Sequence, residues 1–303
     1  MGRGAAVKDT IIGTSLSPAH VPYPSDQDVA TFFDEAAQIG NHITWIIEWQ
    51  QMPPIETVER VRQVAMLKGF KFHLYLSPIA LTGGRKSPAI PAIVGASSFG
   101  DERVHTAFVG QAMALAALRP DYLGLGTEVN FLDQNPREFD AYVALVHEAY
   151  RAIKREYPAQ IVTISFQWDV MRAHQQYSML TRFADTLDAY SFTSYPDAFG
   201  DVPAIAADYY SSVRRVLPDQ RLGFSKLGWS SAAPSNEDLQ AAFWRRIPEL
   251  MKDARPEFVT LALLHDVSVF SGDLARLNYV GIRTIDDRPK KSWPVLVTLP
   301  PMH

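Results

Sequence analysis

The sequence of 303 residues contains no cysteine. This absence excludes disulfide bonds, thiolate metal sites and cysteine nucleophiles. An excess of one charge is also missing, because 29 basic and 33 acidic residues give a net charge of −4. The two signs are interspersed, so no surface for nucleic acid or an anionic membrane is predicted. Apolar stretches are only as long as strands and are interrupted by glycine, proline or charge, so no membrane-spanning helix is predicted.

The first nine residues carry one or two positive charges but no apolar run of signal-peptide length. Two expectations are consistent with this pattern. The protein stays in the cytoplasm, or it is secreted or periplasmic and its export signal has been removed. The sequence leaves the compartment and the oligomeric state open.

Short β-branched or aromatic runs alternate with longer segments of helical period along the whole chain. We expect strands at residues 10–13, 42–49, 71–77, 122–126, 161–166, 189–194, 221–225 and 258–264. We expect helices at residues 26–39, 54–68, 101–118, 136–157, 174–186, 203–216 and 235–252. Eight such units in about 300 residues predict an α/β fold, a (β/α)8 TIM barrel forming a single domain over residues 1–303.

A doubly wound open sheet is the competing fold. That fold usually carries a glycine-rich phosphate loop after its first strand, and the segment from Gly13 to Pro18 is not one. The stretches 77–100 and 194–203 are expected to be long loops after the third and sixth strands. In a barrel such loops lie at the carboxyl-terminal face, where binding sites are built.

Reading the strand ends in order gives a set of aromatic, amide, carboxylate and basic side chains. The set comprises Glu48, Trp49, Thr127, Glu128, Asn130, Gln167, Trp168, Tyr195, Lys226, Trp229, His265 and Asp266. Aromatic rings cover the apolar faces of sugars, and amides and carboxylates bind their hydroxyls. The set therefore predicts an oligo- or polysaccharide ligand.

Single residues in this set have more than one interpretation. The three tryptophans could fill the core or stack on sugar, and Glu48 could point outward or face the pocket. His265 and Asp266 are adjacent in a strand, so at most one is expected to face the barrel interior. The histidines show no paired spacing typical of metal ligands, and neither a metal nor another cofactor is predicted.

Two motifs resemble those of the clan A glycoside hydrolases, which are retaining (β/α)8 enzymes. In that family an acid/base glutamate follows the fourth strand, as Gly126-Thr127-Glu128 does here. The family's nucleophile glutamate follows the seventh strand, often as Ser-Glu-x-Gly-Trp-x-Ser. The present sequence has Ser225-Lys226-Leu227-Gly228-Trp229-Ser230-Ser231 in that place. The segments 192–196 and 281–293 also look like the family's strand-six tyrosine region and closing segment.

The resemblance implies that Glu128 is the general acid/base and that Lys226 occupies the place of the nucleophile. Thr127 stands where the family has the asparagine that binds the sugar 2-hydroxyl. Three hypotheses follow. The first, which the resemblance favours, is a glycoside hydrolase whose second carboxylate is Glu48 or Asp266. The second is a sugar-binding protein without hydrolysis, with a Glu128–Lys226 ion pair. The third is a lyase or aldolase that uses Lys226 as a Schiff base.

Overall fold

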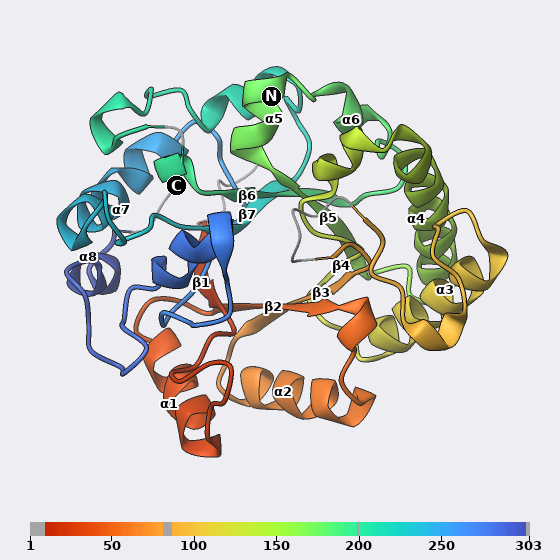
Figure 1. Ribbon diagram of the computed structural model, residues 1–303, viewed down its shortest axis with the longest axis horizontal. Helices are drawn as coiled ribbons and strands as arrows, with labels where there is room; N and C mark the ends of the chain where they lie inside the picture. The colour runs from red at the N-terminus through yellow and green to blue at the C-terminus, as the bar shows by residue number, and fades with distance from the viewer. Residues whose placement is uncertain (1–9, 81–86, 199, 301–303) are drawn as a thin grey trace, which may run out of the picture. The chain divides into compact units, whose positions relative to one another are not determined.

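Eight parallel strands close into one barrel in this computed structural model, in the order in which they occur along the chain (Figure 1). The structure describes residues 10–80, 87–198 and 200–300. The strands are β1 (Ile11–Ser15), β2 (His42–Glu48), β3 (Lys71–Ser77), β4 (Tyr122–Gly124), β5 (Ile161–Gln167), β6 (Ala189–Ser194), β7 (Leu222–Leu227) and β8 (Phe258–Leu261). This confirms the predicted (β/α)8 fold.

Helices connect the strands, as parallel neighbours require. They are α1 (Asp26–Ala36), α2 (Ile55–Leu67), α3 (Glu102–Ala117), α4 (Pro136–Glu156), α5 (Trp168–His174), α6 (Ser178–Thr181), α7 (Glu237–Met251) and α8 (Ser292–Val297). Short 3-10 helices are η1 (Trp49–Gln51), η2 (Ala92–Val94), η3 (Val129–Gln134), η4 (Pro196–Ala198), η5 (Val202–Ala204), η6 (Ser211–Arg215) and η7 (Gly272–Tyr279). Within the described residues no helix is long and apolar enough to cross a membrane.

Two of the predicted helices are wrong. The range 174–186 is interrupted because Gln175 adopts a left-handed conformation (φ 53°) and ends α5. The range 203–216 holds the end of η5 and all of η6, but no α-helix. There the guanidinium of Arg246 on α7 donates to the carbonyls of Val202 and Ile205 and so holds η5 and the residue after it against α7.

The chain divides into two compact units. Residues 42–194 form one, which we call the β2–β6 unit. Residues 1–41 and 195–303 form the other, which we call the β7–β1 unit because β7, β8 and β1 lie in it. The assignment of residues 1–303 to a single domain stays a prediction.

In the β2–β6 unit, one face of the sheet carries rings and hydroxyls at alternate positions. His73 lies 4.3 Å from Tyr75 in a stacked arrangement, and it hydrogen-bonds Thr163 at 3.0 Å. The ring of Tyr75 occupies the space where a side chain on Gly124 would lie, since an added Cβ would come within 2.0 Å of it. Burial lowers the pKa of His73 well below its ordinary value, so this imidazole is neutral.

A β-bulge interrupts the pairing of β7 with β8. Phe224 pairs with Val259 and Leu227 pairs with Leu261, so two residues of β7 oppose Thr260 alone. Phe224 packs edge-on against Tyr210, which shows that its side of β7 faces the surrounding elements. Ser225 and Lys226 are the two residues in the bulge. A bulge re-aims a side chain that strict alternation would send to the other face, so alternation along β7 does not fix the direction of Lys226.

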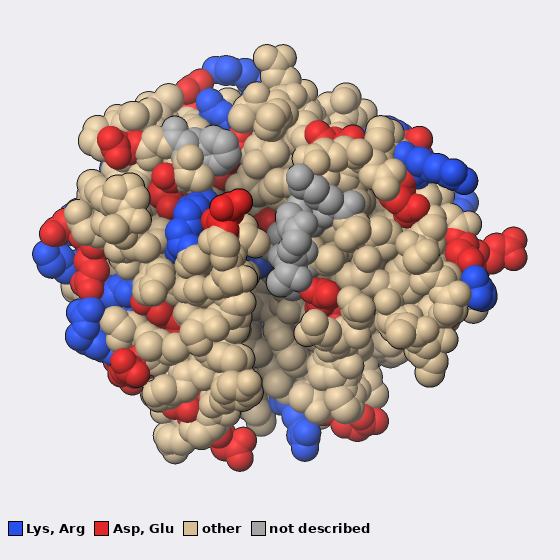
Figure 2. All heavy atoms as spheres, viewed as in Figure 1, with Lys and Arg blue, Asp and Glu red and all other residues tan. Residues whose placement is uncertain are grey.

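Charged side chains of both signs are scattered among uncharged ones on the face shown in Figure 2. This agrees with the interspersed charge of the sequence.

Candidate functional site

Glu128 follows β4 in a backbone conformation that side chains rarely adopt. Its φ is 55° and its ψ 40°, and the residue is 4 % exposed. A left-handed conformation costs a residue with a Cβ on the order of 1–2 kcal/mol. The backbone N–H of Glu128 donates to Oγ of Ser165 at 3.1 Å, and Oγ1 of Thr127 lies 2.9 Å from the same oxygen. Ser165 of β5 therefore fixes the turn that carries the predicted acid.

Asn130 is buried, and its carboxamide is engaged with the protein. Its Nδ2 donates to the carbonyl of Gln167 at 3.2 Å and to Oε1 of Gln176 at 2.7 Å. Its Oδ1 accepts from the backbone N–H of Gln167 at 2.7 Å. The asparagine predicted to bind a hydroxyl thus joins the turn after β4 to the end of β5.

A second set of hydrogen bonds links β5 to β6. Gln167 caps α5, because its Oε1 accepts from the backbone N–H of Val170 at 2.7 Å. Its Nε2 donates to Asp169 at 2.7 Å, and the other carboxylate oxygen of Asp169 accepts from Ser194 at 2.7 Å. The carboxyl-terminal ends of β4, β5 and β6 therefore form one connected polar framework.

All three tryptophans of the predicted set are packed inside the protein. Trp49 is 3 % exposed and lies edge-on to Phe108 of α3 at 5.1 Å. Trp168 is fully buried and lies edge-on to Phe192 at 5.4 Å. Trp229 is 1 % exposed and donates its indole N–H to Ser235 at 2.9 Å. These environments favour core filling over sugar stacking.

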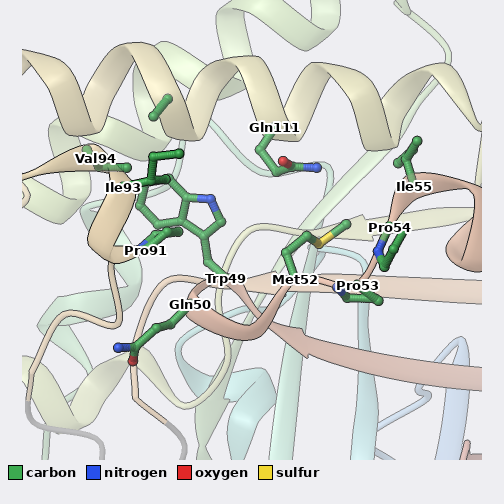
Figure 3. A pocket seen from close by; sticks show the side chains of 11 residues that line it. Trp49, Gln50, Met52, Pro53, Pro54, Ile55, Pro91, Ile93, Val94 and Gln111 are labelled. Carbon is green, nitrogen blue, oxygen red and sulfur yellow. The ribbon is translucent and has the colours of Figure 1, made fainter.

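Trp49 also lines a cavity of about 530 Å³ in the β2–β6 unit. Figure 3 shows its indole beside Ile93 and Val94, with Gln111 extending from α3 above it. The lining residues are Trp49, Gln50, Met52, Pro53, Pro54, Ile55, Pro91, Ile93, Val94, Ala107 and Gln111. No charged residue is among them.

Glu48 is the last residue of β2 and directly precedes Trp49. It is partly exposed and in register with Ser77 of β3.

In the β7–β1 unit, Lys226 is partly exposed within the bulge. Tyr195 is 9 % exposed and belongs to an apolar cluster with Ala262 and Val280. A Cβ on Gly228 would come within 3.2 Å of the Tyr195 ring, so a glycine after Leu227 permits this close packing.

His265 and Asp266 follow β8 and have different partners, as expected for neighbours in an extended chain. Asp266 accepts from the ammonium of Lys290 at 2.7 Å, and the pair is buried. Burial raises the pKa of Asp266 to about 6, although Lys290 acts in the opposite direction. Lys290 also donates to Oγ of Ser231 at 2.9 Å and to the carbonyl of Tyr279 at 3.2 Å.

His265 belongs to a cluster that the sequence did not predict. Its Nε2 lies 2.9 Å from Oδ1 of Asp287 and 3.1 Å from Oε2 of Glu35. Potential ligand atoms of these three residues all lie within 4.8 Å of one another, which is close enough to consider a metal ion. Arg283 occupies the same cluster, however, with Nε 2.6 Å from Asp287 and 3.1 Å from Glu35. No periodic spacing connects residues 35, 265, 283 and 287, so no sequence pattern could have found them.

No family model and no curated protein matches the chain. Solved structures do match it. GH5_18 from Streptomyces cattleya, in complex with Manb1-4GlcNAc, has a TM-score of 0.77 at 16% identity, covering 97% of this chain and 82% of that one. GH5_18 from Bifidobacterium longum subsp. infantis has a TM-score of 0.75 at 15% identity, covering 95% and 78%.

A third similar structure, the GH53 catalytic domain of Ignisphaera aggregans, has a TM-score of 0.69 at 15% identity and covers 97% of this chain and 96% of its own. The predicted resemblance to clan A glycoside hydrolases is thus confirmed at the level of the fold.

Proposed function

We propose that this protein binds a short β-linked oligosaccharide at the carboxyl-terminal ends of its barrel strands, and that it does not catalyse retaining hydrolysis. Sites in (β/α)8 proteins lie at that face. The connected framework of β4, β5 and β6 offers a rigid wall there. The Streptomyces cattleya protein named above was solved with Manb1-4GlcNAc, which supports a β-linked manno-oligosaccharide as the first ligand to test.

The observation that carries the proposal is the bulge in β7. It contains Lys226, which is partly exposed and occupies the place of the nucleophile in the segment that resembles the clan A motif. A retaining glycosidase needs two carboxyl groups about 5–5.5 Å apart. A protonated lysine cannot attack the anomeric carbon, and its charge opposes the positive charge of an oxocarbenium-like transition state. We expect Lys226 to donate hydrogen bonds to bound sugar.

The other acids near the strand ends of the β7–β1 unit have partners of their own. Asp266 accepts from Lys290 inside the protein. Asp197 pairs with Arg276 at 2.5 Å. Using either carboxylate as a base would require breaking a buried or half-buried ion pair, which is costly. This argues against Asp266 as the second carboxylate of a hydrolase.

Inverting hydrolysis is the second candidate, with Glu128 as acid and Glu48 as base. It is favoured by the position of Glu48 at the end of β2, partly exposed and with Ser77 beside it on β3. An inverting pair needs about 6.5–9.5 Å between its carboxyl groups so that a water molecule fits.

One experiment separates these functions. Calorimetric titration with Manβ1-4GlcNAc, mannobiose, cellobiose and chitobiose measures binding, and NMR detection of reducing ends follows hydrolysis in the same samples. Saturable heat without product supports the binding protein. Product with inverted anomeric configuration supports the Glu48 mechanism, and product with retained configuration overturns both.

Two variants locate the site. Glu128→Gln keeps the shape of the side chain but removes its charge, and we expect at least a tenfold weaker affinity. The matched control is Glu148→Gln on α4, since the Glu148 side chain is 49% exposed and pairs with His105 at the surface. An unchanged affinity in Glu128→Gln would move the site away from the end of β4.

A further inference from the structure

The His265 cluster joins four segments of the β7–β1 unit. Glu35 comes from the last turn of α1, His265 follows β8, and Arg283 and Asp287 lie between η7 and α8. Nδ1 of His265 lies 3.0 Å from the backbone carbonyl of Ser17, just after β1. The side chain of His265 is 1% exposed and that of Glu35 10% exposed. The cluster therefore sits largely inside the protein.

Hydrogen-bond chemistry fixes the protonation of this imidazole. A backbone carbonyl only accepts, so Nδ1 must carry a proton to bond Ser17. Nε2 faces the carboxylate oxygens of Asp287 and Glu35, which also accept, so it must carry a proton as well. Both ring nitrogens are protonated only in the imidazolium form. With Glu35 and Asp287 ionised, this geometry requires a charged His265.

The charges of the cluster balance with this assignment. Two carboxylates, Glu35 and Asp287, meet two cations, His265 and Arg283. The Arg283 guanidinium also lies over the ring of Trp293, with its carbon 4.6 Å from the ring centroid. A divalent metal with a neutral imidazole would leave one net positive charge among mostly buried groups, and would compete with Arg283 for both carboxylates. The imidazolium explains the arrangement better than a metal ion does.

The protonated form is also favoured energetically. Burial alone would lower the pKa of His265, but hydrogen bonds to Glu35, Asp287 and the Ser17 carbonyl outweigh it and raise the pKa above its ordinary value. A raised pKa contributes stability that is fully present below the unfolded value and is lost as pH rises through the folded value.

The cluster holds the segment 281–289 against its neighbours. His265 and Arg283 form an isolated parallel bridge, and the backbone N–H of Asp266 donates to the carbonyl of Arg283 at 2.9 Å. Asp287 is bound on two sides, because it accepts from the Arg283 guanidinium at 2.6 Å and pairs with His265 at 2.9 Å. Removing the proton on Nε2 would set a lone pair of His265 against two carboxylates.

We propose that His265 is a pH-sensitive clasp that fixes the segment 281–289 to α1 and to the turn after β1 while its imidazole is doubly protonated, and releases that segment as pH rises above neutrality. The charged groups facing the imidazole are Glu35 from α1 and, from the segment itself, Asp287 and Arg283. Asp266 is directed to Lys290 instead.

Hydrogen–deuterium exchange on the full chain tests the clasp. Peptides covering residues 281–289 are followed at pH 6 and pH 9, with exchange times corrected for the intrinsic pH dependence. We expect protection to fall by about tenfold at pH 9, which equals about 1.4 kcal/mol. Peptides of β5 serve as the internal control and should not change. In His265→Gln the same segment should be weakly protected at both pH values. Equal wild-type protection at both values would overturn the proposal.

A second measurement does not depend on a tolerated variant at position 265. Ring-nitrogen NMR at pH 7 should show one histidine with both nitrogens protonated, and Glu35→Gln should move its titration to lower pH because one carboxylate partner is neutralised. Two results would overturn the clasp. One is a His265 ring that carries a single proton at pH 7 or that binds added Zn²⁺. The other is a His265 titration that Glu35→Gln does not move.

Discussion

The ammonium of Lys290 lies 2.7 Å from the carboxylate of Asp266, and the two side chains are 2% and 8% exposed. Removing one partner of a buried ion pair leaves an uncompensated charge in the protein interior. We expect Lys290→Met to lower the free energy of unfolding by about 3–5 kcal/mol, measured by urea denaturation. The double variant Lys290→Met/Asp266→Leu should recover most of that loss, since both charges are then gone.

The neighbouring lysine provides a matched control. Lys291 pairs with Asp238 at 2.7 Å, but the two side chains are 59% and 73% exposed. An exposed pair contributes about 0–1 kcal/mol. Equal losses in Lys290→Met and Lys291→Met would show that the Asp266–Lys290 pair is not buried in solution.

Asp266 also predicts a pH dependence of stability. Burial raises its pKa from 3.8 to about 6, so the folded state binds the proton more tightly than the unfolded chain does. The resulting stabilisation is fully present below 3.8 and is lost as pH rises through about 6. We expect the melting temperature of wild type, relative to that of Asp266→Asn, to decrease between pH 4.5 and pH 7. A pH-independent difference would contradict the shifted titration.

Strand positions were predictable from the sequence because one local signal, apolar β-branched runs bounded by turn residues, acts over four to eight residues. The ranges 71–77 and 189–194 agree with β3 and β6 at both ends. The helix predicted at 203–216 is wrong, and the segment before it is held instead by Arg246, distant in sequence, which binds the carbonyls of Val202 and Ile205. A local pattern contains no information about such a partner.

The candidate site shows the same limit. Counting along alternating positions cannot reveal a bulge, so the orientation of Lys226 could not be derived from β7 alone. Asn130 was correctly placed after β4, but its bonds to Gln167 and Gln176 link residues 37 and 46 positions apart. Polar residue types at strand ends predict where a site lies, and long-range contacts decide which of them still have donors and acceptors for a ligand.

Asn130 should behave as a structural residue more than as a ligand-binding one. Asn130→Ala would leave the backbone N–H and carbonyl of Gln167 without their side-chain partners. Each buried polar group left unpaired costs about 1–3 kcal/mol, so we expect a loss of roughly 3 kcal/mol in urea denaturation. The control Asn236→Ala removes only the exposed cap of α7 and should cost about 1 kcal/mol. A fully stable Asn130→Ala protein with weakened saccharide binding would return Asn130 to the ligand site.

The replacement Lys226→Glu tests whether the lysine occupies a nucleophile position on an otherwise competent scaffold. If it does, the new carboxylate should create or raise hydrolysis of an aryl β-glycoside by about tenfold, equal to about 1.4 kcal/mol of transition-state stabilisation. Lys226→Met removes the charge without supplying a carboxylate and should show no gain. Adding Glu128→Gln to Lys226→Glu should slow formation of the glycosyl-enzyme for poor leaving groups, because these need the proton donor. A folded Lys226→Glu protein that binds saccharide and gains no hydrolysis would refute a nucleophile position at residue 226, while leaving the binding function intact.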